Sequence, residues 1–171
     1  MEVKRIKRLI NSYPFFLLLL AVMFFLMMNT QKFLKVSGES MVPTLKDKDI
    51  CFMEPVISPE RGQIYVVLEP DNLTADAGRI WAVKRLIGLP GDTVELNDCN
   101  TYVNGEQVLP EIVGTWEHMT FELGPDEYLF IGDNRQNSWD GRYWSRPVHK
   151  DEILYHVTFR IWPMVKIGRV G

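Results

Sequence analysis

The sequence predicts a mainly β domain of antiparallel sheet, preceded by one N-terminal transmembrane helix. Three observations lead to this fold class. One long apolar stretch occupies residues 13–28, near the start of the chain. The rest of the sequence consists of short β-like runs separated by Gly, Pro, Asn and Asp. No segment after residue 30 has the sustained 3.6-residue period of an amphipathic helix.

The apolar stretch predicts a membrane anchor. It contains only Phe, Leu, Ala, Val and Met after Tyr13 and Pro14, and with Leu9 and Ile10 it approaches the roughly 20 residues that span a bilayer core. Four basic residues precede it and two follow it, which predicts a cytoplasmic N-terminus. We therefore expect a single-pass protein of the cell membrane, in contact with the lipid bilayer. Its parts would be a cytoplasmic basic tail (1–11), a transmembrane anchor (12–30) and an extracytoplasmic domain (31–171).

A cleaved secretory signal is the main alternative, because it also combines a basic start with an apolar core. Residues 29–32, Asn-Thr-Gln-Lys, lack the small-x-small spacing that cleavage requires. The stretch is also long for such a signal, and it has no polar face that would suit a buried helix. We favour an uncleaved anchor.

Length and charge limit what the rest of the chain can be. About 136 of the 171 residues lie from Val36 onward, enough for one domain with a core. Beyond residue 11 the chain has 15 basic and 21 acidic residues, a formal net charge of −6. This balance argues against a nucleic-acid partner.

The expected strands follow from period-2 alternation and from turn residues. Asn104-Gly105 between two β-like runs is a strong signal for a two-residue hairpin. Segments 71–78 and 114–124 read as loops. The predicted strands span residues 49–53, 63–68, 80–87, 93–96, 102–108, 128–131 and 153–162.

The two cysteines lie in different settings. Cys51 is in an apolar run and Cys99 is in a turn-like run. An oxidising compartment permits a disulfide between them, but their spacing does not require one, so both a bridge and a buried thiol stay open. No His and Cys cluster has metal-ligand spacing, and we expect no metal and no cofactor.

Ser40 is a candidate nucleophile, in the run Ser-Gly-Glu-Ser-Met-Val-Pro-Thr at residues 37–44. A serine hydroxyl needs a base to take its proton, and histidine is the usual one. The three histidines, His118, His149 and His156, lie in no recognisable catalytic motif, and the run lacks the second glycine of a nucleophile elbow.

Lysine can be that base when burial lowers its pKa. Strand alternation in residues 80–87 places Ile80, Ala82 and Lys84 on one face. Lys84 would then emerge from an apolar face. Arg85, on the other face, would reach solvent or pair with a carboxylate. An exposed lysine at a strand edge remains the plain alternative.

Three motifs follow the anchor in order: SMVPT at residues 40–44, KRLIGLPGD at 84–92 and GDNRQNSWDGR at 132–142. In this arrangement the chain resembles the bacterial type I signal peptidases, a family of membrane-bound serine endopeptidases. The resemblance implies an antiparallel β-sheet catalytic domain of signal-peptidase type. It also implies removal of N-terminal signal peptides from exported preproteins, through an acyl-enzyme and after small-x-small sites.

The resemblance also implies roles for individual residues. Ser40 matches the nucleophile, Lys84 the general base, and Ser138 the serine that orients the lysine. Asp140 and Arg142 match a charged pair that stabilises the catalytic region, and Asp133, Asn134 and Arg135 begin the same segment in structural roles.

Two further candidates come from the residues themselves. The Ser40 backbone N–H is the best oxyanion donor that the sequence offers. Met41 follows the nucleophile directly and is a candidate for substrate contact, with core packing as the equal alternative.

The chain departs from the family pattern at three positions. Gly141 replaces a common serine between the charged pair, Gln63 replaces an aspartate, and Gly38 replaces a serine that adds an oxyanion donor in some relatives. Two other readings stay open. One is a membrane-tethered β domain that binds extended peptides without cleavage, and the other is a Ser/Lys self-cleaving protein of the repressor type.

Overall fold

The computed structural model describes residues 14, 16–23, 25, 32–71, 80–97, 100–109 and 118–170, and all structural statements below concern these residues. By its internal contacts the chain divides into two units, Met1–Lys32 and Phe33–Gly171. In the first unit, Pro14, residues 16–23 and Phe25 are helical. None of the helices within the described ranges combines the length and the apolar character that a membrane crossing requires. Nine of the 19 residues of the predicted anchor (12–30) lie outside the described residues, so the anchor stays a prediction.

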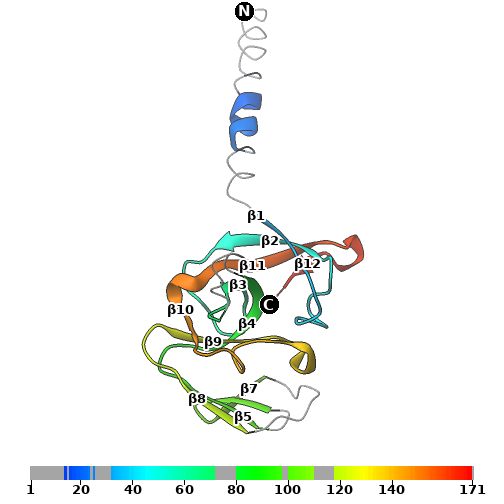
Figure 1. Ribbon diagram of the computed structural model, residues 1–171. Helices are drawn as coiled ribbons and strands as arrows, with labels where there is room; N and C mark the ends of the chain where they lie inside the picture. Colours follow the sequence, from blue (N-terminus) through cyan, green and yellow to red (C-terminus); the bar gives the residue numbers. More distant parts are fainter. Residues whose placement is uncertain are drawn as a thin grey trace, which may run out of the picture. The chain divides into compact units, whose positions relative to one another are not determined.

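The second unit is built from two antiparallel sheets, which confirms the mainly β prediction (Figure 1). The larger sheet has the order β1-β2-β11-β3-β4-β9-β10, and β12 pairs with β11. Its strands are β1 (Lys32–Lys35), β2 (Ile50–Pro55), β3 (Ile64–Leu68), β4 (Trp81–Gly88), β9 (Glu127–Ile131), β10 (Val148–His149), β11 (Ile153–Trp162) and β12 (Gly168–Arg169).

The smaller sheet has the order β7-β6-β5-β8 and follows directly from β4 in the chain. Its strands are β5 (Thr93–Asn97), β6 (Asn100–Val103), β7 (Glu106–Leu109) and β8 (Met119–Glu122). Three short 3-10 helices complete the described elements: η1 (Arg135–Asn137), η2 (Lys150–Glu152) and η3 (Met164–Lys166).

Most predicted strands are present, with boundaries shifted by one or two residues. The predicted run 102–108 is divided into β6 and β7 by the expected hairpin, in which both Asn104 and Gly105 have positive φ. The prediction of a loop over residues 114–124 is wrong in part, because Met119–Glu122 forms β8. This strand pairs with β5, and long-range pairing of this kind leaves little local signal.

Strand β3 explains how the large sheet is packed. All five of its residues are buried, so both of its faces meet core. Ile64 and Val66 belong to one buried cluster, which also holds Met41 and Leu45 from the loop after β1. Tyr65 belongs to a second cluster on the opposite face. The loop that carries Ser40 is therefore fixed against one face of the sheet by apolar burial.

The pairing of β4 with β9 places the third motif beside Lys84. β4 pairs with β9, and Arg85 is opposite Ile131. Gly132, the first residue of the motif 132–142, comes directly after β9. Two motifs about 50 residues apart thus meet at adjoining positions on neighbouring strands.

Candidate active site

Ser40 lies in a turn whose neighbours are anchored in the core. Met41 is 1% exposed and Leu45 is fully buried, and the Leu45 N–H donates to the Met41 carbonyl at 2.8 Å. Gly38 has a φ of +88°, a conformation that glycine adopts without strain. Ser40 itself is half-buried, so its hydroxyl is near the surface on a backbone that the core fixes.

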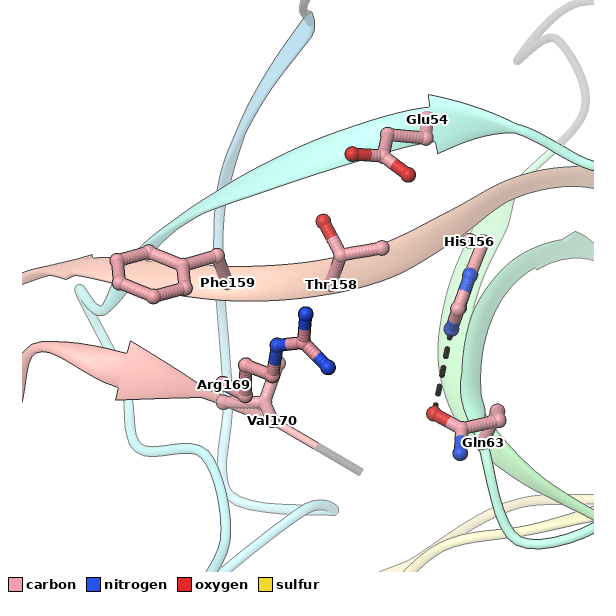
Figure 2. Close-up of a pocket in the computed structure, with 7 residues that line it drawn as sticks. All are labelled: Glu54, Gln63, His156, Thr158, Phe159, Arg169 and Val170. Atoms are coloured by element: carbon pink, nitrogen blue, oxygen red, sulfur yellow. Dashed lines mark hydrogen bonds between the residues drawn. The ribbon is translucent and has the colours of Figure 1, made fainter.

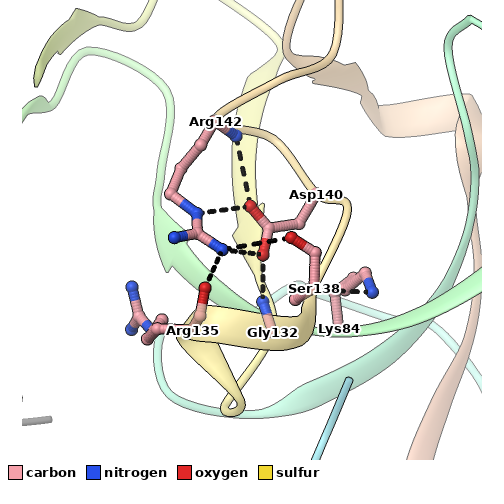
Figure 3. A network of polar contacts seen from close by, with 6 residues as sticks. All are labelled: Lys84, Gly132, Arg135, Ser138, Asp140 and Arg142. Atoms are coloured by element: carbon pink, nitrogen blue, oxygen red, sulfur yellow. Dashed lines mark hydrogen bonds and ion pairs between the residues drawn. The ribbon is translucent and has the colours of Figure 1, made fainter. Parts of the chain in front are cut away.

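Lys84 is buried in β4, with 4% of its surface exposed. The structure confirms the alternation expected there, because Ala82, Lys84 and Leu86 are buried and Val83 and Arg85 are half-buried. The Lys84 Nζ donates to Ser138 Oγ at 3.1 Å (Figure 3). Burial lowers the pKa of Lys84, and the negative charges of Asp140 and Glu69 oppose that shift in part.

Ser40 and Lys84 line one pocket of about 300 Å³. Its buried apolar lining includes Val36, Met41 and Val66, and two exposed tryptophans, Trp81 and Trp139, line it as well. Met41 therefore packs in the core and also lines the pocket, and its contact with a substrate stays a prediction.

A larger pocket, of about 480 Å³, contains neither of these residues. Figure 2 shows His156, Glu54, Thr158 and Arg169 around it, with the His156 Nε2 3.3 Å from the Gln63 side-chain oxygen. Since this pocket combines no nucleophile with a base directed at it, we place the candidate site at Ser40.

Asp140 and Arg142 form a buried ion pair next to Ser138. The Arg142 Nε and the Asp140 Oδ1 are 2.8 Å apart, and both side chains are at most 1% exposed. Asp140 also accepts the Gly132 N–H at 2.9 Å, while Arg142 donates to the carbonyls of Arg135 and Ser138 (Figure 3). The pair thus connects both ends of the segment that carries Ser138.

A second ion pair fixes the loop that follows Ser40. Arg85 binds both Asp133 oxygens, at 2.8 and 2.6 Å, and Thr44 Oγ1 donates to Asp133 Oδ2 at 2.5 Å. Of the two outcomes expected for Arg85, the structure shows the pairing with a carboxylate. Sequence reasoning did not identify Thr44 as a partner of Asp133, because the two residues are 89 positions apart in the chain.

Asn134 holds the backbone of the nucleophile turn directly. Its N–H donates to the Ser40 carbonyl at 2.9 Å, and its side-chain amide donates to the Glu39 carbonyl at 3.0 Å. Asn137 adds a longer contact, 3.4 Å, to the Glu39 carboxylate. The resemblance implied only an unspecified structural role for Asn134, and the structure identifies its partners.

The remaining candidates are placed as follows. Within the described part of the chain, the Ser40 N–H donates to no backbone carbonyl outside the helices and strands, and its role as an oxyanion donor stays a prediction. Cys51 is a buried thiol, and burial raises its pKa to about 11, while Cys99 lies outside the described residues. Among the described side chains, no group of three or more His, Cys, Asp or Glu is placed to hold a metal ion.

The arrangement defines a class of protein. A serine hydroxyl and a buried amine share a pocket, and a second hydroxyl accepts a hydrogen bond from the amine. None of the described residues that line the pocket is a histidine. These are the groups that a serine hydrolase with a lysine base requires.

Comparison with known proteins identifies the family. The model of the family described as "Signal peptidase, peptidase S26" matches residues 8–162, and the chain belongs to this family. This confirms the resemblance drawn from the three motifs.

Two relatives with similar sequences agree with this assignment. A probable signal peptidase I-2 from Synechocystis is 35% identical over 140 residues, which cover 78% of this chain and 64% of that protein. The chain thus spans slightly less than two thirds of that relative. Signal peptidase I S from Bacillus subtilis is 33% identical, over 80% of this chain and 79% of the relative. A solved signal peptidase I from Enterococcus faecalis is 26% identical with a TM-score of 0.48, and the match covers 57% of this chain and 95% of that one.

Proposed function

We propose that this protein is a membrane-anchored serine endopeptidase that removes N-terminal signal peptides from exported preproteins, with Ser40 as nucleophile and Lys84 as general base. The observation that carries the proposal is that Ser40 and the buried Lys84 line one pocket, in a chain that belongs to the signal peptidase family. A site that bound peptides without cutting them would not need a buried amine beside a serine hydroxyl.

The first half of the reaction is acylation. Neutral Lys84 accepts the Ser40 proton as Ser40 Oγ attacks the carbonyl carbon of the cleaved bond. The Ser40 N–H donates to the oxyanion that forms. When the C–N bond breaks, the Lys84 ammonium gives its proton to the leaving amine, and the signal peptide remains as an ester on Ser40.

The second half is hydrolysis of that ester. Neutral Lys84 takes a proton from water, which attacks the ester carbonyl, and Ser40 Oγ is released with the proton that Lys84 returns. Ser138 orients the Lys84 Nζ through its hydroxyl throughout. Asp140 and Arg142 act indirectly, because they fix the backbone on either side of Ser138.

Substrate geometry follows from the pocket. A peptide that binds in extended form, by strand addition, directs alternate side chains to the same side. The first and third residues before the cleaved bond would then meet the buried apolar wall, where space is limited and small side chains fit. This accounts for cleavage after small-x-small sites.

The membrane part of the proposal rests on the sequence. Residues 13–28 are apolar, and Ser40 follows Met28 by only twelve residues. A signal peptide held in the bilayer by its own apolar core presents its cleavage site near the membrane surface. An anchor with a cytoplasmic N-terminus and an extracytoplasmic catalytic domain would keep Ser40 within reach of such sites. Alkaline carbonate extraction tests the anchor, and the full-length chain should stay in the membrane fraction.

The test of the chemistry is processing of a purified precursor by the full-length protein. Ser40→Ala and Lys84→Ala should each abolish cleavage. The matched controls Ser145→Ala and Lys46→Ala, at an exposed serine and an exposed lysine outside the pocket, should retain it. Processing that persists in either site variant contradicts the assignment.

A further inference from the structure

Trp139 is an exposed aromatic side chain in the wall of the candidate active site, and the mechanism above gives it no task. It follows Ser138 directly, lines the pocket that holds Ser40 and Lys84, and is 58% exposed. Large aromatic side chains of a folded domain are mostly buried, and Trp144 from the same segment is one of these. An exposed indole in the wall of the pocket that holds Ser40 is a candidate for contact with a ligand.

Among the described residues, one aromatic ring packs against the Trp139 indole. Its ring stacks on Tyr143 with centroids 5.2 Å apart and an interplanar angle of 15°. The Arg142 guanidinium lies 5.1 Å from the Tyr143 ring, and Arg142 is itself fixed by Asp140. This series of contacts extends from the buried ion pair to the pocket, so Trp139 is held in place although it is exposed.

The pocket offers two different kinds of wall to an extended peptide. Val36, Met41 and Val66 are buried and apolar, whereas Trp81 and Trp139 are exposed, and of these two Trp139 is the one stacked on Tyr143. Successive side chains of an extended peptide point to opposite faces. When the two small residues of a small-x-small site point to the buried wall, the residue between them points the other way, toward the exposed part of the pocket.

We propose that Trp139 contacts this middle residue and selects for a large apolar side chain there, aromatic ones above all. The inference rests on the proposed function, since it presupposes that Ser40 cleaves after small-x-small sites. An indole face that is fixed in advance loses little conformational entropy when an aromatic or long aliphatic group packs on it. A glycine at the same position has no side chain to make this contact.

The test uses the full-length protein and two precursors that differ at one residue, with Ala-Phe-Ala or Ala-Gly-Ala before the cleaved bond. Wild type should cleave the Phe precursor with a kcat/KM about 3- to 10-fold higher, the range expected for one aromatic contact, mainly through a lower KM. Trp139→Ala should reduce this ratio to about one, and Trp139→Phe should keep most of it. Trp162→Ala, at a half-exposed tryptophan outside the pocket, should keep the wild-type ratio.

The outcomes separate this inference from the proposed function. If wild type cleaves neither precursor, or Ser40→Ala still cleaves, the proposed function fails. If wild type cleaves both precursors and Ser40→Ala cleaves neither, the function stands, and the ratio in Trp139→Ala decides the inference. An unchanged ratio overturns it, and so does an equal loss on both precursors, because that result would assign Trp139 a purely structural role.

Discussion

Two pockets of the same domain each contain a basic side chain whose pKa is lowered by burial, Lys84 in one and His156 in the other. Each pocket also contains a hydroxyl, from Ser40 and from Thr158. They differ in what the base contacts. Lys84 donates to Ser138 Oγ, whereas the His156 ring stacks on Tyr65 and its Nε2 lies 3.3 Å from an amide oxygen.

The difference shows what a lowered pKa does and does not indicate. The His156 Nε2 contacts the Gln63 side-chain oxygen and not a hydroxyl, so this contact gives the base no nucleophile to deprotonate. Lys84, in contrast, is positioned by a hydroxyl whose segment is fixed by the buried Asp140–Arg142 pair. A buried base is a catalytic candidate only where a nucleophile shares its pocket and a rigid support orients it.

The largest expected effect comes from removing that support. Asp140→Asn leaves the buried Arg142 charge without its counter-charge, and breaking such a pair costs about 3–5 kcal/mol in the free energy of unfolding. Urea unfolding measures this, and precursor cleavage should fall as the Ser138 segment shifts. Glu54→Gln, at an exposed carboxylate of the other pocket, should change the unfolding free energy by no more than about 0.5 kcal/mol. If Asp140→Asn and Glu54→Gln lost the same free energy of unfolding, the two pockets would not differ in their support as we infer.

A somewhat smaller effect should come from crowding the Lys84 pocket. A Cβ on Gly132 would lie 2.2 Å from Ser138 Oγ and 2.6 Å from the Ser40 carbonyl oxygen, so both groups must move. A displacement of about 1 Å at a catalytic group can cost about 100-fold in rate, and we expect Gly132→Ala to lose kcat on that scale. Gly168→Ala meets no atom within 4 Å and serves as the control. If Gly132→Ala kept the wild-type kcat, the site would tolerate displacement of Ser138 and of the Ser40 backbone, which would contradict this prediction.

The pH dependence of cleavage tests which base titrates. In the proposed mechanism neutral Lys84 is the active form, so kcat/KM should rise with pH along its acid limb. Burial disfavours the ammonium, so the apparent pKa of that limb should lie below the ordinary 10.5 of lysine. Precursor cleavage measured from pH 6 to pH 11 gives the profile. A profile that stays flat through the alkaline range would argue against a lysine base.

The smallest effect is expected from the second pocket. His156→Gln removes an imidazole that the mechanism does not use, and kcat/KM should change by less than about twofold, as for a change outside the site. The apparent pKa at which kcat/KM rises with pH should also stay the same as in the wild type. A loss as large as that of Lys84→Ala would transfer the catalytic role to His156 and reverse the comparison.

The sequence predicted the features that local patterns encode. The alternation of apolar and polar residues located the long strands and predicted that Lys84 lies on the buried face of its strand. Asn104-Gly105 located the hairpin. Very short strands such as β10 and β12, two residues each, have too few residues for a period to be visible.

Contacts across long sequence separations were not predictable from these patterns. The pairing of Thr44 with Asp133 and the contacts of Asn134 with the Ser40 turn depend on how β4 and β9 align, and residue types alone do not fix that alignment. The resemblance supplied the identity of the candidate site residues. The hydrogen bonds and ion pairs that hold these residues in place became visible only with the fold.

The bonds from Asn134 to the Glu39 and Ser40 carbonyls also bear on when the site becomes functional during folding. They join segments 94 to 95 residues apart, and contacts of such separation form slowly because a long loop must close first. The nucleophile turn therefore reaches its final geometry only after β9 and the residues that follow it have joined the sheet. A nascent chain that ends before residue 132 would contain both Ser40 and Lys84 but neither Asn134 nor Ser138, so we expect it to be inactive.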